Sequence, residues 1–163
     1  MTTTRTLMTL SLLALAAACG GPGSDAEIPA AEPAGETAKD IGDHVVHFSA
    51  LSTDQLPPTI ASTYNIVRSK NRAMLNVSII NEDDGVPVPG DVTVKAVNLT
   101  GQLKNVTMRR IDEPGQGDAF DAIYYIGVTP VANRETLRFE ISVKPEGATT
   151  PNVVVFSRTF YTD

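Results

Sequence analysis

Within residues 43–163, two histidines and two methionines are the side chains that could bind a soft metal ion. His44 and His47 stand three residues apart in an apolar stretch, and Met74 and Met108 lie further along the chain. A single imidazole combined with a thioether is a ligand set that suits copper. However, residues three apart on a β-strand point to opposite faces, so the two histidines cannot chelate one ion together. We therefore interpret them as half-exposed strand residues and predict no metal site and no cofactor.

The densest cluster of basic side chains consists of Arg68, Lys70 and Arg72, with Asn71 before the last of them. Guanidinium and ammonium groups beside an amide could bind a phosphate or a carboxylate. The alternative is a solvated loop, in which the long side-chain stems pack over the edge of the fold and Asn71 supplies a left-handed turn. We favour the loop, and keep the four residues as a candidate surface for a ligand or a partner.

Asp121 is the carboxylate that we considered as a general base, because it falls inside a predicted strand on the face opposite the apolar residues. No histidine is near it in the sequence, and Arg109 or Arg110 could pair with it. The chain contains no G-x-S-x-G, phosphate-loop, HExxH or Cys-pair motif. We therefore predict a protein that is not an enzyme and has no catalytic residue.

Residues 1–18 have the pattern of a secretory signal peptide. Arg5 lies near the start, an apolar run follows over residues 7–15, and small residues lead to Cys19. The apolar run is too short to span a bilayer, which needs roughly 20 residues. Cys19 is the one cysteine of the chain, so it has no disulfide partner. The signal predicts export.

The stretch LAAAC at residues 15–19 resembles the lipobox of bacterial lipoproteins, in which the cysteine sulfur receives a diacylglyceryl group. The best lipoboxes carry Leu three places before the cysteine, where this chain has Ala16. We predict lipidation of Cys19 and anchoring to a membrane in the periplasm. Gly20 rather than Asp follows the cysteine, which favours the outer membrane. Ordinary cleavage, giving a soluble periplasmic or secreted protein, is the alternative.

Residues 19–42 are rich in Gly, Pro, Ala and acidic residues, and only Ile28 and Ile41 are large and apolar. Such a segment cannot bury enough apolar surface to offset its ordering entropy, so we expect a lipidated, disordered tether. Residues 43–163 are then one folded domain. The formal net charge of the whole chain is −6, which argues against binding to nucleic acid.

From residue 43 onward, apolar and polar residues alternate as they do in half-buried strands. Seven strands are expected, over residues 44–51, 72–80, 91–100, 103–111, 120–128, 137–143 and 153–161. Pro57 and Pro58 before Ile60 and Ala61 predict one short helix that covers an end of the fold. Seven short strands with turn signals between them predict an all-β fold, an antiparallel sandwich of immunoglobulin-like type.

Two details of strand register are also predicted. The apolar residues of the third strand change phase between Ala96 and Val97, which indicates a β-bulge there. The fifth strand carries an apolar set on one of its faces. This set consists of Phe120, Ala122, Tyr124 and Ile126.

Several short motifs along the folded part, in this order, resemble a family of exported proteins from Gram-negative bacteria that share a domain of unknown function, DUF4426. The motifs are VVHFSAL (45–51), RSKNR (68–72), NLTGQL (98–103), DAIYYI (121–126), LRF (137–139) and FYTD (160–163). The resemblance covers residues 43–163. It implies an envelope protein with no assigned activity, and it assigns no catalytic or binding residue.

Taken together, these features favour a non-catalytic binding or assembly module that is tethered in the periplasm and contacts an envelope protein. The membrane would be contacted only through the lipid at Cys19. The alternative function is a periplasmic carrier of a small ligand or of copper, and an enzyme ranks last.

Overall fold

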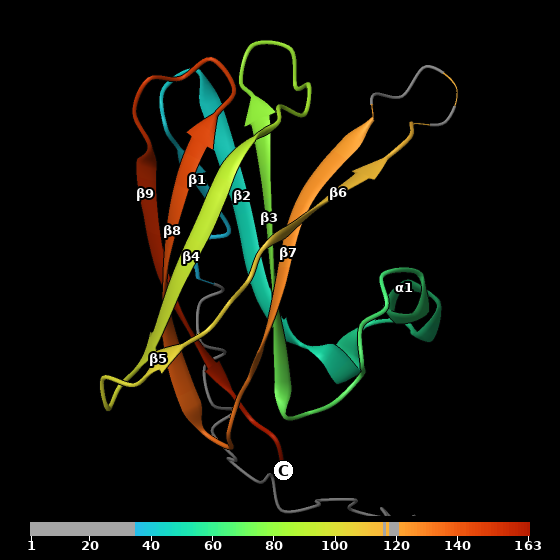
Figure 1. Ribbon diagram of the computed structural model, residues 1–163, viewed down its shortest axis with the longest axis vertical. Helices are drawn as coiled ribbons and strands as arrows, with labels where there is room; N and C mark the ends of the chain where they lie inside the picture. The colour runs from blue at the N-terminus through green and yellow to red at the C-terminus, as the bar shows by residue number, and fades with distance from the viewer. Residues whose placement is uncertain (1–34, 116, 118–120) are drawn as a thin grey trace, which may run out of the picture. The chain divides into compact units, whose positions relative to one another are not determined.

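Alternating residues give each strand one apolar face, and two sheets bury these faces against each other. The computed structural model of the chain describes residues 35–115, 117 and 121–163. Among these residues, five strands form one sheet in the order β1-β2-β3-β7-β6, and four form a second sheet in the order β5-β4-β8-β9 (Figure 1). Every pair of neighbouring strands is antiparallel. The described residues therefore form a β-sandwich.

The five-stranded sheet consists of β1 (Ala38–Asp40), β2 (His44–Ser52), β3 (Arg72–Asn81), β7 (Ala122–Pro130) and β6 (Arg109–Glu113). The four-stranded sheet consists of β5 (Leu103–Lys104), β4 (Gly90–Asn98), β8 (Glu135–Pro145) and β9 (Asn152–Phe160). Between β2 and β3 lie a 3-10 turn (Thr53–Gln55) and the short helix α1 (Pro58–Thr63). With β1 set aside, the two strand orders are the A-B-E-D and C′-C-F-G sheets of an immunoglobulin-like sandwich. The predicted fold class is confirmed.

The described residues contain nine strands rather than the predicted seven, and one reason is a strand that changes sheets. The single strand expected over residues 103–111 is divided into β5 and β6, which belong to opposite sheets. The chain between them crosses β7 at Gly127, where an added Cβ would lie 2.6 Å from the Met108 Sδ and 2.8 Å from the Val106 Cγ1. Glycine at this position permits the close crossing.

The other additional strand, β1, lies within the segment predicted to be tether. Ala38–Asp40 pair with Val45–His47 of β2, and the Phe48 N–H donates to the Thr37 carbonyl oxygen at 2.8 Å. Ile41 packs against the main core. The domain boundary at residue 43 was therefore placed too late. An exposed edge strand gains backbone hydrogen bonds without burying its side chains, so residues 38–40 show no apolar alternation.

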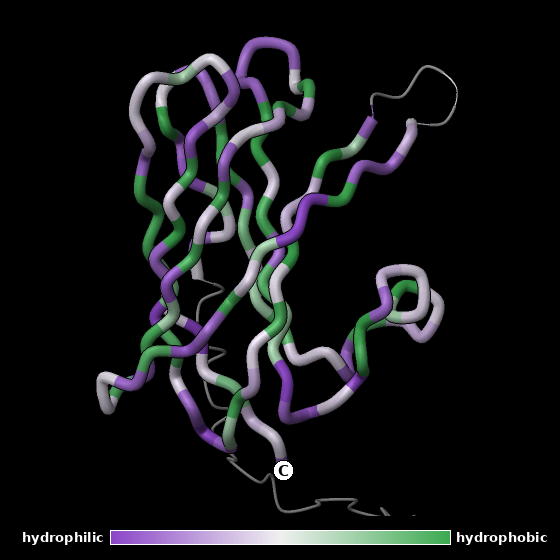
Figure 2. The backbone as a smooth tube through the Cα atoms, in the orientation of Figure 1, coloured by the Kyte–Doolittle hydropathy of each residue, from purple (hydrophilic) through white to green (hydrophobic). Residues whose placement is uncertain are grey.

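The main core lies between the sheets, and Figure 2 shows the alternation of apolar and polar residues along the strands that build it. Phe156 of β9 connects the two sides, because its ring centroid lies 4.7 Å from that of Phe48 and 5.0 Å from that of Phe139. The predicted bulge in β4 is wrong. This strand pairs with β8 without interruption from Gly90 to Asn98, and Leu99 lies in the following turn with 83% of its surface exposed.

A second, smaller apolar cluster lies on the outer face of the five-stranded sheet. Leu56, Ala61 and Ile66, from the segment around α1, pack there with Met74 of β3 and Ile126 of β7. The helix therefore covers a sheet face, and the prediction that it covers an end of the sandwich is wrong. The predicted apolar face of β7 is this outer face, whereas Ile123 and Tyr125 point into the main core. Phe120 lies outside the described residues.

Candidate functional site

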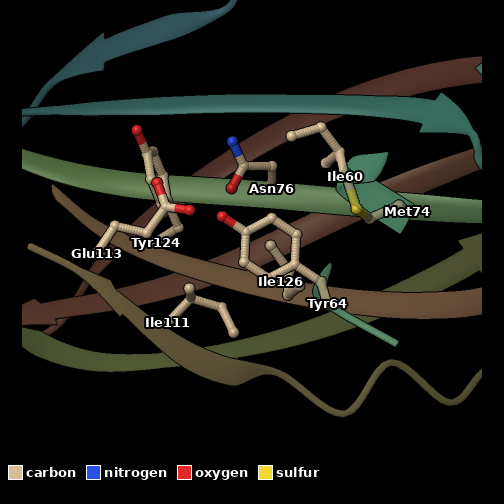
Figure 3. Close-up of a pocket in the computed structure, with 8 residues that line it drawn as sticks. All are labelled: Ile60, Tyr64, Met74, Asn76, Ile111, Glu113, Tyr124 and Ile126. Carbon is tan, nitrogen blue, oxygen red and sulfur yellow. The ribbon is translucent and has the colours of Figure 1, made fainter. Parts of the chain in front are cut away.

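The segment around α1 covers only part of the outer sheet face and leaves a groove of about 320 Å³ beside it. We call this cavity the α1 groove. Its walls come from α1 and the residue after it, and from β3, β6 and β7 (Figure 3). The lining residues are Ile60, Tyr64, Met74, Asn76, Ile111, Glu113, Tyr124 and Ile126.

Strand pairing places the floor of the groove. Residues two apart on a strand share a face, so Met74 and Asn76 of β3 point to the same side as Tyr124 and Ile126 of β7. Asn76 is paired directly with Ile126, and Tyr124 is paired with Ile111 of the edge strand β6. The floor is therefore as rigid as the sheet itself, and its side chains are held in fixed register.

The wall formed by α1 is fixed by hydrogen bonds on both sides of the helix. The Thr53 hydroxyl, which is fully buried, lies 2.9 Å from the Val67 carbonyl oxygen, and the Ser69 N–H donates to it at 2.9 Å. The Arg109 guanidinium of β6 donates to the carbonyl oxygen of Tyr64, the residue that ends α1. These contacts close the loop at its base and tie the end of the helix to the sheet, so the groove is built into the fold.

The groove is mainly apolar, but hydrogen-bond acceptors gather on one side of it. The Asn76 Oδ1 is buried and has no hydrogen-bond partner among the described residues. Glu113 lies on the same sheet face and forms no ion pair with any other described residue. Figure 3 shows the Glu113 carboxylate, the Asn76 amide and the Tyr64 hydroxyl turned toward the same part of the groove. An acceptor without a donor is costly inside a protein, so this arrangement suits a ligand that donates.

A larger depression of about 500 Å³ lies between β2 and β9, beside Phe48 and Phe156. These two side chains form part of the main core. None of the buried side-chain oxygens that lack a partner in the described part of the chain belongs to a residue that lines this depression. The α1 groove is therefore the better candidate site, because it combines a cavity with an unpaired buried polar atom.

The predicted basic cluster is spread along the loop before β3. The Arg68 guanidinium donates to the Asp54 carbonyl oxygen at 2.6 Å, and the Lys70 ammonium donates to the Asp163 carbonyl oxygen at 2.8 Å. The Asn71 carbonyl oxygen accepts the Val131 N–H at 2.9 Å. Arg72 lines a separate depression of about 260 Å³. The structure thus does not bring these four side chains together at one cavity. The Arg68 and Lys70 side chains fasten the loop to backbone groups, and Asn71 does so through its own backbone carbonyl.

His44, His47 and Asp121 do not line the α1 groove. His44 is half-buried and His47 is exposed, and no group of three His, Cys, Asp or Glu residues in the described ranges could hold a metal ion. The Asp121 Oδ1 accepts the Gly115 N–H at 2.9 Å, which closes the loop between β6 and β7. Arg110 pairs with Asp112 at 2.6 Å. Asp121 therefore organises a turn.

The predicted signal peptide, Cys19 and the part of the predicted tether up to residue 34 lie outside the described residues. Within those residues, no helix is long and apolar enough to cross a membrane.

The α1 groove was not predicted from the sequence, although one signal for it is present. The stretch AIYYI of β7 places large residues on both faces of the strand, so its outer face also needs cover. The segment around α1 is short and covers only part of that outer face. A strand that is apolar on both faces beside a short helix therefore indicated a second packing surface, and Asn76 on the adjacent strand indicated polarity within it.

No curated protein matches this chain. A crystal structure of a DUF4426 family protein from Pseudomonas aeruginosa PAO1 is similar to it, with 32% sequence identity and a TM-score of 0.66. The match covers 79% of this chain and 97% of that chain. The model of the domain of unknown function DUF4426 matches residues 38–163, which begin at β1. The resemblance seen in the sequence motifs is therefore confirmed, and the chain belongs to the DUF4426 family.

Proposed function

We propose that this protein is a non-catalytic binding module of the bacterial cell envelope, held to a membrane through a lipid on Cys19. Its α1 groove binds a group presented by another envelope protein. The observation that carries the proposal is the buried Asn76 Oδ1, which lines an apolar cavity and has no partner among the described residues.

A buried acceptor without a partner costs about 1–3 kcal/mol. A side chain needed only for packing would be apolar at this position, because Met74 and Ile126 beside it are buried. A polar atom at such a place is explained when a ligand supplies the missing donor. The unpaired Asn76 Oδ1 therefore supports a binding surface rather than a purely structural one.

The support for a binding module rather than an enzyme is the chemistry of the lining. The eight side chains include one carboxylate, one amide and two phenols, and none is a serine, cysteine, histidine or lysine. This set can bind and orient a donor, but it lacks the paired nucleophile and base of covalent catalysis. The support for the membrane anchor comes from the sequence at residues 15–19 alone.

Site-specific photo-crosslinking in living cells tests the proposal. A photoreactive residue replaces Ile60, which stands at the rim of the groove with 41% of its surface exposed. The matched control replaces Lys95, an exposed residue of β4 in the other sheet. We expect a discrete crosslinked protein from position 60 and none from position 95. Equal patterns from both positions, or no crosslink at position 60, would refute the groove as the binding surface.

A further inference from the structure

The shape of the α1 groove and the position of its polar atoms restrict what it can bind. Apolar side chains from four elements line most of it: Ile60 of α1, Met74 of β3, Ile111 of β6 and Ile126 of β7. A volume of about 320 Å³ corresponds to about ten water molecules, at roughly 30 Å³ each. The groove therefore accommodates one long side chain but not a large cofactor.

The charge of the groove restricts the ligand further. Glu113 is the one charged residue in the lining, and no described cation pairs with it. The Asn76 Oδ1 adds a second acceptor, and the Tyr64 and Tyr124 rings can contribute their negative faces. An anionic ligand would be repelled by Glu113, and an uncharged apolar ligand would leave both acceptors without donors.

Lysine and arginine side chains match these features, because each combines an apolar stem with a cationic donor at its tip. We propose that the α1 groove binds a lysine or arginine side chain from a basic segment of a partner protein. The stem lies along the apolar lining, and the cationic group reaches Glu113 and the Asn76 Oδ1. This inference rests on the proposed function and specifies the ligand of the same groove.

A protein partner suits the groove better than a free amine. A small molecule is normally enclosed over most of its surface, whereas the Ile60 wall of this groove is 41% exposed and open to a neighbouring surface. The formal net charge of −6 would also attract a basic segment. Weak affinity is expected for one side chain, and the rest of the partner would add contacts around the rim.

A titration with short capped peptides tests the inference. The mature protein in mild detergent is titrated with Gly-Gly-Lys-Gly-Gly and with two matched peptides, in which norleucine or glutamate replaces lysine. The readout is the NMR signals of the Asn76 side-chain amide and of the Tyr124 and Ile126 backbone amides. We expect the lysine peptide to shift these signals, the norleucine peptide to bind at least tenfold more weakly, and the glutamate peptide to leave them unchanged.

Variants of the protein locate the cation. Glu113→Gln removes the charge but keeps the shape, and we expect it to weaken the lysine peptide about tenfold, as for loss of a hydrogen bond to a charged group. Glu140→Gln is the matched control, because Glu140 lies on β8 in the other sheet. It should leave the affinity unchanged. Unchanged signals away from position 113 would confirm that Glu113→Gln is folded.

The outcomes separate the ligand class from the proposed function. If the norleucine or glutamate peptide shifts the groove signals as strongly as the lysine peptide, the groove is not specific for a cationic side chain. The proposal that the groove is a binding site would still stand. Equal weakening by Glu113→Gln and Glu140→Gln would show general attraction to acidic residues and would overturn the inference. If no peptide shifts the signals and position 60 yields no crosslink, both proposals fail. If the protein alone forms a dimer that is lost in Glu113→Gln, the bound lysine or arginine belongs to a second copy of this chain. The proposal of a different partner protein would then be wrong.

Discussion

The Tyr125 hydroxyl accepts a hydrogen bond from the Gly90 N–H at 2.7 Å and thereby links the two sheets. Tyr125 belongs to β7 of the five-stranded sheet, and Gly90 is the first residue of β4 in the four-stranded sheet. Only 5% of the Tyr125 surface is exposed, so its hydroxyl would be poorly solvated without this partner. The pair fixes the start of β4 against the strand whose opposite face forms the groove floor.

Replacing Tyr125 with phenylalanine tests this link. The ring would remain in the core, but the Gly90 N–H would lose its acceptor, so we expect a loss of about 1–2 kcal/mol in the free energy of unfolding. Urea denaturation measures it. Tyr161→Phe is the control, because Tyr161 is 64% exposed and should change stability little. Equal effects from the two variants would contradict a specific role for the Tyr125 hydroxyl.

Glu135 makes the stability of the protein depend on pH. Burial alone would raise the pKa of its carboxyl group, but hydrogen bonds from the Asn98 side chain, the Lys104 ammonium and the Ala132 N–H outweigh burial and lower this pKa. The Lys104 Nζ lies 2.9 Å from the Glu135 Oε1, and both side chains are largely buried. The pair holds the short strand β5 and the hairpin before it against β8.

Because the pKa of Glu135 is lower in the folded state, its contribution is complete above the ordinary value of 4.5 and is lost as the pH falls through the folded value. We expect Glu135→Gln to reduce stability near neutral pH and to flatten its decline in acid. Unfolding free energies between about pH 7 and about pH 3 measure this. Glu140→Gln, in an exposed pair with Arg138, should follow the wild-type curve; a parallel curve for Glu135→Gln would disprove the assignment.

Gly127 permits the crossing between β5 and β6. A Cβ there would lie 2.6 Å from the Met108 Sδ, so Gly127→Ala should cost about 1–3 kcal/mol of unfolding free energy through overpacking. Gly35→Ala is the control, because a Cβ there meets nothing within 4 Å. Thermal unfolding of the two variants measures the difference. A stability of Gly127→Ala equal to that of the control would mean that the crossing segment can move aside.

Cys19 is predicted to carry the lipid that holds the protein to a membrane. We expect mass spectrometry of the mature N-terminus to find an acylated Cys19, and Cys19→Ser to shift the protein from the membrane fraction to the soluble fraction. Two or more acyl chains give stable anchoring, so the shift should be nearly complete. Membrane association that persists in Cys19→Ser would contradict the anchor.

The fold class was predictable because apolar and polar residues alternate along most of the strands. Leu137, Phe139 and Ile141 of β8 alternate with polar residues, and all three are buried between the sheets as this pattern indicates. The family was recognisable for the same part of the chain. The same alternation did not locate every turn. Leu99 continues the apolar pattern of β4 but lies exposed in the turn that follows the strand.

The features that could not be predicted from the sequence depend on contacts between segments that are far apart in it. The division of residues 103–111 into β5 and β6 follows from the crossing over Gly127, about 20 residues away, which no local pattern reveals. The α1 groove likewise requires α1, Asn76 of β3 and Glu113 of β6 to meet on one sheet face. The alternation along β3 places Asn76 on the face opposite Leu75 and Val77, but it does not show that the segment around α1 reaches that face.

The central claim is that Asn76 is retained for a ligand and not for the fold, and Asn76→Leu tests it most directly. The two side chains are similar in size, and leucine would remove the buried Oδ1 that lacks a partner in the described part of the chain. We predict that the free energy of unfolding of Asn76→Leu, measured by urea denaturation, rises by about 1 kcal/mol or more over wild type. A decrease of that size would show that the Asn76 amide stabilises the sheet, and would contradict the account.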